Sequence, residues 1–381
     1  MATYIRKKAA VGQGRAEGAG FQPSHSPLFM ITNDPVIHQL ISLLAAGKRK
    51  QEEAPGRPIR IELSRSLIAR VKETFRLRIL RGELNLHLAS NVLASHFLGH
   101  DCELHSNVIG MLPGAESRPF LIRERITREI LFSQTDLDLG NLMVGKFRYQ
   151  ASEGWAPLSL AANFVEYLPP GYVETGVNRI TSRVKAEEEV WNKVTDELFN
   201  VDELLLRDKH LHQFSKFIKD VFGIKIVCEN EKACMLVHEH LQRLTAGECD
   251  WSVLKRFDIP AFDPVRGGSD RPLLEFIETK NYLTCDISRM KKTGWKALKS
   301  VVRWNGELLE IQVQPLDNYY LELDHMAGPS HNSFKLVRDA LRRQVAERFP
   351  LYGFYRDLLQ CIFLDGEIPP TLAEVSLVMT E

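Results

Sequence analysis

The feature that most constrains the fold is a pair of strand-like segments joined by Asn305-Gly306. ALKSVVRW precedes this dipeptide and ELLEIQVQ follows it, and both are strand-like. Asn-Gly tolerates the positive backbone angles of a type I′ turn, whose twist matches that of antiparallel strands. The segment therefore predicts a β-hairpin, and with it a β-sheet.

The second strand of this hairpin has an unusual polar side. Glu310, Gln312 and Gln314 are spaced by two, so their side chains point to one face, while the intervening apolar residues point to the other. A carboxylate and two amides are poor core material unless they line a polar cleft. A solvent-facing strand surface is the alternative, which this strand taken alone favours.

Helix-like and strand-like segments alternate along the rest of the chain. Further strands are expected in PFLIRERI, NFVEYL and GIKIVC. Helices are expected at Pro35–Ala46, in two or three segments between Ser64 and His100, at Thr175–Leu198, His210–Val221, Glu231–Leu244 and His331–Phe349, and after Leu351. This order predicts an α+β protein whose mixed β-sheet is flanked by helices.

The chain has 381 residues, a natural size for two domains. Pro169-Pro170-Gly171 marks a boundary between them. We expect a flexible basic tail with one short helix at 1–57, a separate mostly helical or mixed N-terminal domain of unknown role at 58–172, a sheet-containing domain at 173–350, and a C-terminal helical extension at 351–381.

Bulk composition argues against several classes of protein. Lys plus Arg and Asp plus Glu both total 49, so overall charge indicates neither a nucleic-acid nor a membrane partner. The six cysteines are scattered without a CxxC pair, which argues against a disulfide framework or a cysteine zinc site. No apolar run has the length of a transmembrane helix, and the basic start lacks the apolar stretch of a secretory signal. We therefore expect a cytoplasmic protein.

Two segments could bind phosphates or a metal ion. In ITSRVKAEEEVWNKV, Arg183, Lys185 and Lys193 surround an expected helix start, which suits a polyphosphate; a salt-bridged exposed helix is the alternative. Asp220 precedes the strand that contains Lys225. If it faces a carboxylate from a neighbouring strand, the pair suits magnesium, which takes one or two carboxylates plus phosphate oxygens; a helix or turn cap is the alternative.

A third segment, KNYLTCDISRMKKTGWKALKSVV, places one tryptophan, Trp295, among several lysines at the entrance to the hairpin. These lysines are Lys280, Lys291, Lys292, Lys296 and Lys299. An aromatic face beside cations can stack a base and hold its phosphates. A buried tryptophan rimmed by solvated lysines is the alternative.

Taken in order, these segments resemble the synthetase domain of the RelA/SpoT family. That family has a basic R-x-K-x-x-x-S-x-x-x-K segment, an aspartate in D-x-x-x-[IV]-R, then K-D-Y, N-G-Y-x-S-x-H, E-I-Q-I-R and H-x-x-Y-K. This chain has RVKAEEEVWNK, DVFGIK, KNY, TGWKALK, EIQVQ and HNSFK in the same order. The resemblance covers about residues 175–350, and it implies a nucleotidyltransferase-like fold there.

The resemblance also implies site residues. Arg183, Lys185, Lys193 and Lys225 would hold ATP. Asp220 and Glu310 would bind Mg²⁺, with Glu310 also helping to deprotonate a 3′-hydroxyl and Gln312 orienting the site. Trp295, Lys280, Lys291 and Lys299 would bind the acceptor nucleotide. Trp295 takes the place of a family tyrosine that stacks on guanine.

Several positions depart from the family pattern. Glu189 replaces a serine, Lys225 replaces an arginine and Lys299 replaces a histidine. Thr293 and Trp295 replace Asn and Tyr, and Gln314 replaces an arginine. Three functions therefore stay open: a (p)ppGpp synthetase-like pyrophosphokinase acting on a guanosine or adenosine nucleotide, a toxin-like pyrophosphokinase acting on the tRNA 3′ end, and a non-catalytic nucleotide-binding regulatory module. The acceptor and the oligomeric state are not fixed by the sequence.

The family also contains a metal-dependent HD hydrolase, and SHFLGHDCELH does contain an HD pair. His96 and His100 would share a helix face, but the remaining ligand pattern is missing. Ordinary histidines at a helix end are the favoured interpretation.

Overall fold

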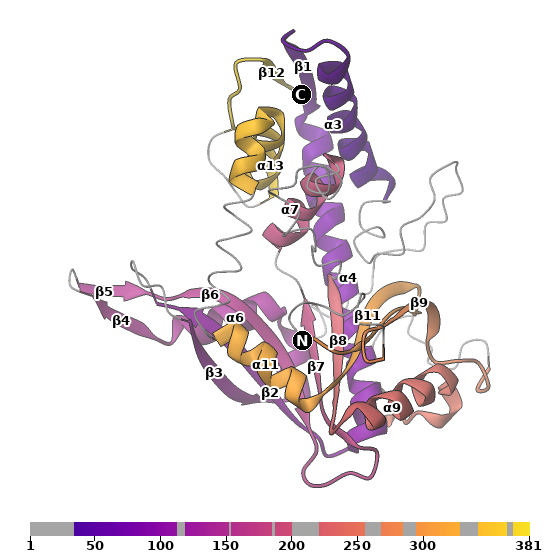
Figure 1. Ribbon diagram of the computed structural model, residues 1–381. Helices are drawn as coiled ribbons and strands as arrows, with labels where there is room; N and C mark the ends of the chain where they lie inside the picture. Colours follow the sequence, from indigo (N-terminus) through magenta and orange to yellow (C-terminus); the bar gives the residue numbers. More distant parts are fainter. Residues whose placement is uncertain are drawn as a thin grey trace.

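The computed structural model describes residues 34–112, 119–151, 154–184, 187–199, 221–255, 268–284, 295–327, 342–363 and 369–381 (Figure 1). Their centre is an eight-stranded sheet of order β3-β2-β6-β7-β8-β11-β10-β9. The strands are β2 (Glu103–Met111), β3 (Pro119–Ile126), β6 (Ser159–Leu168), β7 (Val177–Val184), β8 (Phe222–Cys228), β9 (Glu275–Asn281), β10 (Leu298–Trp304) and β11 (Glu307–Pro315). The β8–β11 pair is parallel and the other neighbours are antiparallel, which confirms the expected α+β class with a mixed sheet.

The predicted hairpin is confirmed as β10 and β11. Asn305 and Gly306 have φ of 49° and 80°, the left-handed values that a type I′ turn requires. The Asn305 amide also donates a hydrogen bond of 2.8 Å to Asn85 Oδ1, which ties the turn to the long helix behind the sheet.

That helix, α4 (Arg65–Leu98), is one unbroken element of 34 residues, so the expectation of two or three helices was wrong. The segment contains no proline, and Ser64 caps its start by accepting a hydrogen bond of 3.0 Å from Leu67 N. Gly82 lies inside the helix, where any side chain would collide with the Phe222 ring from β8, so the close packing of helix and strand requires glycine there.

The helix expected over Thr175–Leu198 was also wrong in its first half. Residues Val177–Val184 form β7, and α7 begins only at Glu187 and ends at Leu198. VNRITSRV is rich in β-branched residues and hydrogen-bonds to a strand on each side, so ladder pairing outweighs any helical pattern. Arg183 therefore lies in a strand and not at a helix start.

Different helices cover the two faces of the sheet. Helix α4 and α9 (Glu231–Arg243) pack on the apolar face, where Phe222 meets Gly82 and His238 meets Ser300. Helix α6 (Asp136–Gly145) lies on the same side, against β2 and β6. Helix α11 (Leu316–Ala327) crosses the opposite face, and Figure 1 shows it in front of the strands.

A second layer lies beyond one end of the sheet (Figure 1). It contains α3 (Pro35–Glu53), the first turns of α4, α7, α13 (Pro350–Phe363) and a parallel pair of β1 (Ile59–Ser64) and β12 (Val375–Thr380). Its core is aromatic: the rings of Trp191 and Phe363 stack at 3.6 Å between centroids, and Phe75 lies 4.7 Å from Trp191. The smaller elements are α5 (Arg128–Ser133), β4 (Arg148–Ala151), β5 (Gly154–Pro157), η2 (Ala246–Glu248) and α10 (Ser252–Lys255).

Most of the other expected helices and strands that fall on described residues are confirmed. The expected strands at 119–126, 163–168 and 223–228, and the expected helices at Pro35, at Glu231 and after Leu351, are confirmed. His210–Val221 lies almost wholly outside the described residues, and of His331–Phe349 only 342–348 is described as helical. The expected domain boundaries stay predictions, but β6 and β7 pair directly, so the sheet continues across residue 172.

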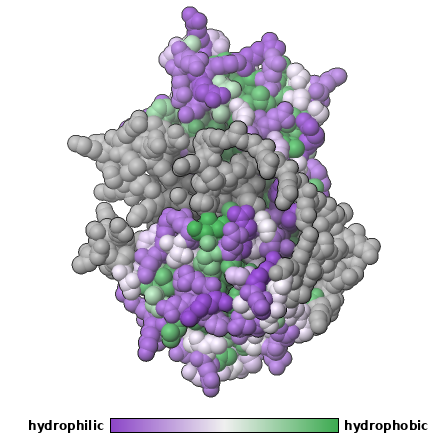
Figure 2. All heavy atoms as spheres, turned by 90° about the vertical axis from the view of Figure 1, so that its right-hand side faces the viewer, coloured by the Kyte–Doolittle hydropathy of each residue, from purple (hydrophilic) through white to green (hydrophobic). Residues whose placement is uncertain are grey.

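The described helices include none long and apolar enough to cross a membrane. On the face seen in Figure 2, small hydrophobic patches are separated by hydrophilic residues.

Candidate functional site

The strand register aligns polar residues in a row across all eight strands. In sheet order the row is Arg125, His105, Glu166, Thr181, Lys225, Gln312, Lys299 and Lys280. Directly paired residues project to the same side, so these side chains share the face that α11 crosses. Four of the predicted site residues, Lys225, Gln312, Lys299 and Lys280, are thus neighbours on four adjacent strands.

The next row along the same face contains Arg183, Gly223 and Glu310, since Gly223 pairs with both of the others. Gly223 has no side chain, so none stands between the exposed Arg183 and the buried Glu310 in this row. The sheet therefore presents a cation and a carboxylate on either side of a bare position.

Glu310 is the centre of the first ion-pair cluster. Its side chain is almost fully buried, with the residue 1% exposed. Lys299 Nζ lies 2.5 Å from Glu310 Oε2, and the Gln312 amide donates a hydrogen bond of 2.6 Å to Oε1. Because Glu310 and Gln314 are both buried, the alternative of a solvent-facing strand surface is wrong for this face.

Glu322 of α11 is the centre of a second cluster, which the sequence did not predict. It accepts hydrogen bonds from Lys225 Nζ at 2.7 Å, from Trp295 Nε1 at 2.7 Å and from Gln314 Nε2 at 2.9 Å. Burial alone would raise the pKa of the Glu322 carboxyl, but Lys225 and the three hydrogen bonds lower it below its ordinary value. The sequence feature that could have predicted Glu322 is the helix that directly follows β11, because such a helix folds back over the sheet.

Two further lysines near these clusters are also paired. Lys280 Nζ lies 2.9 Å from Glu278, and this hydrogen bond raises the pKa of Lys280. Lys296 Nζ reaches Glu231 at 2.6 Å. Farther along, the buried Glu166 contacts Arg179 at 2.8 Å and accepts a hydrogen bond of 3.1 Å from Tyr319 OH, which anchors the start of α11.

The structure thus brings Arg183, Lys225, Gln312 and Lys299 together with Glu310, and it places Trp295 beside Lys225 through their shared partner Glu322. Lys280 lies at the outer end of the row. Asp220, Lys185 and Lys291 lie outside the described residues, as does the side chain of Lys193, whose helix α7 packs against α13. Their roles stay predictions.

The histidines of SHFLGHDCELH do not form a ligand pair. Helix α4 ends at Leu98, so His100 lies beyond it and the two histidines do not share a helix face, contrary to expectation. His100 contacts Ser95 Oγ at 2.7 Å and Asp250 at 3.1 Å, whereas His96 Nε2 lies 2.7 Å from His240 Nε2. Both are accounted for by helix-end contacts.

Comparisons with known proteins give structural neighbours only. No family model matches the sequence, and no curated protein matches it. Small alarmone synthetase 1 from Bacillus subtilis, bound to its product pppGpp, is 19% identical over 47% of this chain and 79% of its own, with a TM-score of 0.22. A second structure of that enzyme is 16% identical over 50% of this chain and 77% of its own, with a TM-score of 0.23. A GTP pyrophosphokinase family protein from Streptococcus pneumoniae is 15% identical over 48% of this chain and 80% of its own, also with a TM-score of 0.23. These TM-scores are low, so the likeness assigns no role to any residue of the polar face.

Proposed function

We propose that the chain is a nucleotide pyrophosphokinase, which transfers the pyrophosphate group of ATP to the 3′-hydroxyl of a guanosine or adenosine nucleotide. One observation carries the proposal. Glu310 and Gln312 of β11 share one polar face with Lys299 of β10 and Lys225 of β8, although Lys225 is far from the other three in the sequence.

In this reaction the protein aligns the 3′-hydroxyl with ATP and neutralises phosphate charge, and it forms no covalent bond to the substrates. The 3′-oxygen bonds to the β-phosphorus of ATP, the bond from that phosphorus to the oxygen bridging the α-phosphate breaks, and AMP leaves. The hydroxyl proton passes to the Glu310 carboxylate, which acts as general base. Lys225 and Lys299 neutralise phosphate charge.

The ion pairs seen in the structure fit this role as exchangeable contacts. Lys299 holds Glu310 and Lys225 holds Glu322, so each lysine already binds an anionic oxygen. Polyphosphate oxygens would compete for the same ammonium groups. When Lys299 turns to a phosphate, Glu310 is released to accept a proton.

Magnesium is the cofactor that this chemistry implies. It takes oxygen ligands, commonly one or two protein carboxylates with phosphates and water. Glu310 supplies one buried carboxylate beside the bare Gly223, and Asp220 would supply the second. These donors fit the ion, which would neutralise phosphate charge when bound. The residues proposed to bind ATP are Arg183, Lys185 and Lys193. Those proposed to bind the acceptor nucleotide are Trp295, Lys280 and Lys291. The proposed location is the cytoplasm.

A second candidate is a nucleotide-binding regulatory module without catalysis. It is favoured by the 2.5 Å contact between Lys299 and Glu310, because a base neutralised by a lysine accepts protons poorly. A tRNA 3′ end remains an alternative acceptor, since the lysines of this face suit a nucleic-acid backbone.

The deciding experiment is a transfer assay with γ-labelled ATP, Mg²⁺ and the full chain. GDP, GTP, ADP, ATP and bulk tRNA are offered separately, with Glu310→Gln as the test variant. Glu278→Gln is the matched control, because Glu278 lies in the same row as Glu310 but at the exposed edge. Label on one acceptor with wild type and control, but not with Glu310→Gln, supports the enzyme. Binding of ATP without transfer to any acceptor supports the regulatory module.

A further inference from the structure

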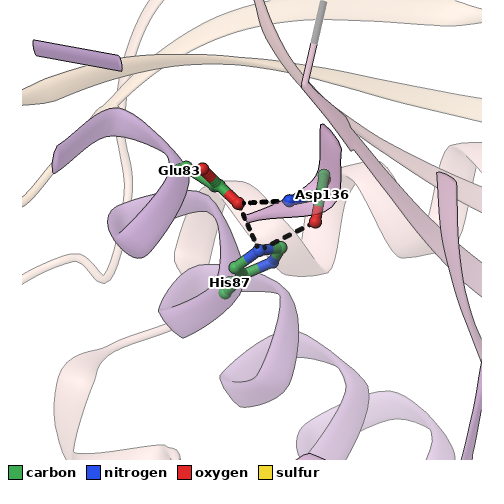
Figure 3. A group of neighbouring side chains, drawn as sticks. All are labelled: Glu83, His87 and Asp136. Atoms are coloured by element: carbon green, nitrogen blue, oxygen red, sulfur yellow. Dashed lines mark hydrogen bonds and ion pairs between the residues drawn. The ribbon is translucent and has the colours of Figure 1, made fainter. Parts of the chain in front are cut away.

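A cluster of ligand-type side chains lies away from the polar face, between α4 and α6. Glu83 and His87 are four residues apart on α4, so they share one side of that helix, and Asp136 is the first residue of α6 (Figure 3). One ligand atom from each lies within 4.8 Å of the others. The sequence did not predict this cluster.

All three side chains are removed from solvent, with 0 to 5% of each exposed. Among the described residues, neither ring nitrogen of His87 and neither carboxylate oxygen of Asp136 has a well-formed hydrogen bond. His87 Nε2 lies 3.1 Å from Asp136 Oδ1 and 3.5 Å from Glu83 Oε1, but neither contact has hydrogen-bond geometry. Buried polar atoms in native proteins nearly always have a partner, so these atoms point to a ligand between them.

The two distances match the spacing of ligands around a metal ion. Zinc binds histidine nitrogen and carboxylate oxygen at about 2.0–2.1 Å, so neighbouring ligand atoms of a tetrahedral site are about 3.3 Å apart. With a neutral imidazole the cluster carries two negative charges in the protein interior. A divalent ion cancels both charges, whereas a proton on His87 cancels one.

We propose that Glu83, His87 and Asp136 bind one divalent transition-metal ion, with zinc as the leading choice, at a buried site where a water molecule would be the fourth ligand. The site is distinct from the magnesium position proposed on the polar face. The ion would link the middle of α4 to the first residue of α6. Glu83 already joins them, because its Oε1 accepts a hydrogen bond of 2.7 Å from Asp136 N.

The test begins with the wild-type full chain, produced with and without added zinc and then dialysed against metal-free buffer. Elemental analysis is expected to find one zinc ion per chain, and the zinc-loaded protein is expected to melt at least about 5 °C above the metal-depleted protein. Cobalt in place of zinc should give the visible absorption of a tetrahedral site. No retained metal and no change in melting temperature with zinc or manganese would overturn the proposal in favour of a proton-bridged cluster.

The variant His87→Gln is expected to lose the ion, whereas His238→Gln should keep it. His238 is the matched control, because it is also a buried helix histidine, 7% exposed, and contacts Ser300 instead of carboxylates. Glu310→Gln should also keep the zinc, which separates this site from the polar face. If His87→Gln folds and retains as much metal as wild type, the ion lies elsewhere and the proposal fails. If His87→Gln does not fold, the wild-type measurements decide.

Discussion

The polar face of the sheet and the cluster between α4 and α6 bury charge in opposite ways. On the polar face Glu310 and Glu322 each have their own lysine, and Lys225 and Lys299 are 28% and 22% exposed, so solutes can reach them. Between α4 and α6 two carboxylates share one fully buried histidine. Paired charges that touch solvent can exchange partners with a substrate, whereas a closed cluster with surplus negative charge suits a permanent ion.

The largest effect expected on the polar face is loss of transfer in Glu310→Gln. Removing a general base lowers the rate by at least about 100-fold. The same change leaves Lys299 beside a neutral amide, so a decrease in stability is also expected. Initial rates in the labelled-ATP assay, read beside thermal melts, separate the two effects. Activity near that of Glu278→Gln would remove Glu310 from the chemistry.

A ligand should distinguish the two clusters directly. Inorganic pyrophosphate is expected to stabilise wild type by about 2.7 kcal/mol at 100 times its dissociation constant, since binding only the folded state shifts unfolding. Lys299→Met should reduce this gain, and His87→Gln should leave it unchanged. The check is the melting temperature against pyrophosphate concentration. An unchanged response in Lys299→Met would mean that the anion binds elsewhere.

Glu322→Gln tests how strongly α11 is held on the sheet. The change removes the charge that Lys225 faces, and a hydrogen bond to a charged group contributes about 2 kcal/mol. Urea unfolding should show that loss, and the double variant with Lys225→Met should recover part of it. Additive losses in the double variant would mean that the two side chains are not coupled.

Trp295→Phe removes one hydrogen bond to Glu322 but keeps an aromatic ring. A cost of about 1 kcal/mol in urea unfolding is expected. If the ring stacks on the acceptor base, Trp295→Ala should weaken acceptor binding more than ATP binding, while Trp295→Phe retains most of the affinity. Titration calorimetry with each nucleotide measures the difference, and equal losses for both would discard the stacking role.

The smallest expected effect is a change in acid sensitivity. Since the folded-state pKa of Glu322 is lowered, its contribution is present above the unfolded-state pKa and is lost as pH falls through the folded-state value. Lys225 is the charged group that faces it. Between neutral pH and about pH 3, wild type should therefore lose more unfolding free energy than Glu322→Gln. Parallel losses would show that Glu322 does not titrate with folding.

Sequence patterns found what depended on local periodicity and missed what depended on tertiary pairing. The hairpin and its polar side could be predicted, because a period of two and an Asn-Gly turn fix them locally. Lys225 and Lys299 were expected at the site only from the family resemblance, since Lys225 joins the hairpin through the distant strand β8. Strand β7 was mistaken for helix, because its pairing with β6 and β8 comes from distant residues. Glu322 and the Glu83–His87–Asp136 cluster were missed, because α11 and α6 place them through contacts that spacing alone does not reveal.

The pairing of β1 with β12 has a consequence for how the chain acquires its structure. Ile59 lies opposite Val375 in a parallel ladder. A strand near the start of the chain therefore cannot form these hydrogen bonds until a strand near the end of the chain has been synthesised. During synthesis β1 would be an exposed strand edge until residues 375–380 leave the ribosome. Long-range pairing of this kind slows folding. The layer that holds α3, α7 and α13 would then close last, after the sheet and its polar face have assembled.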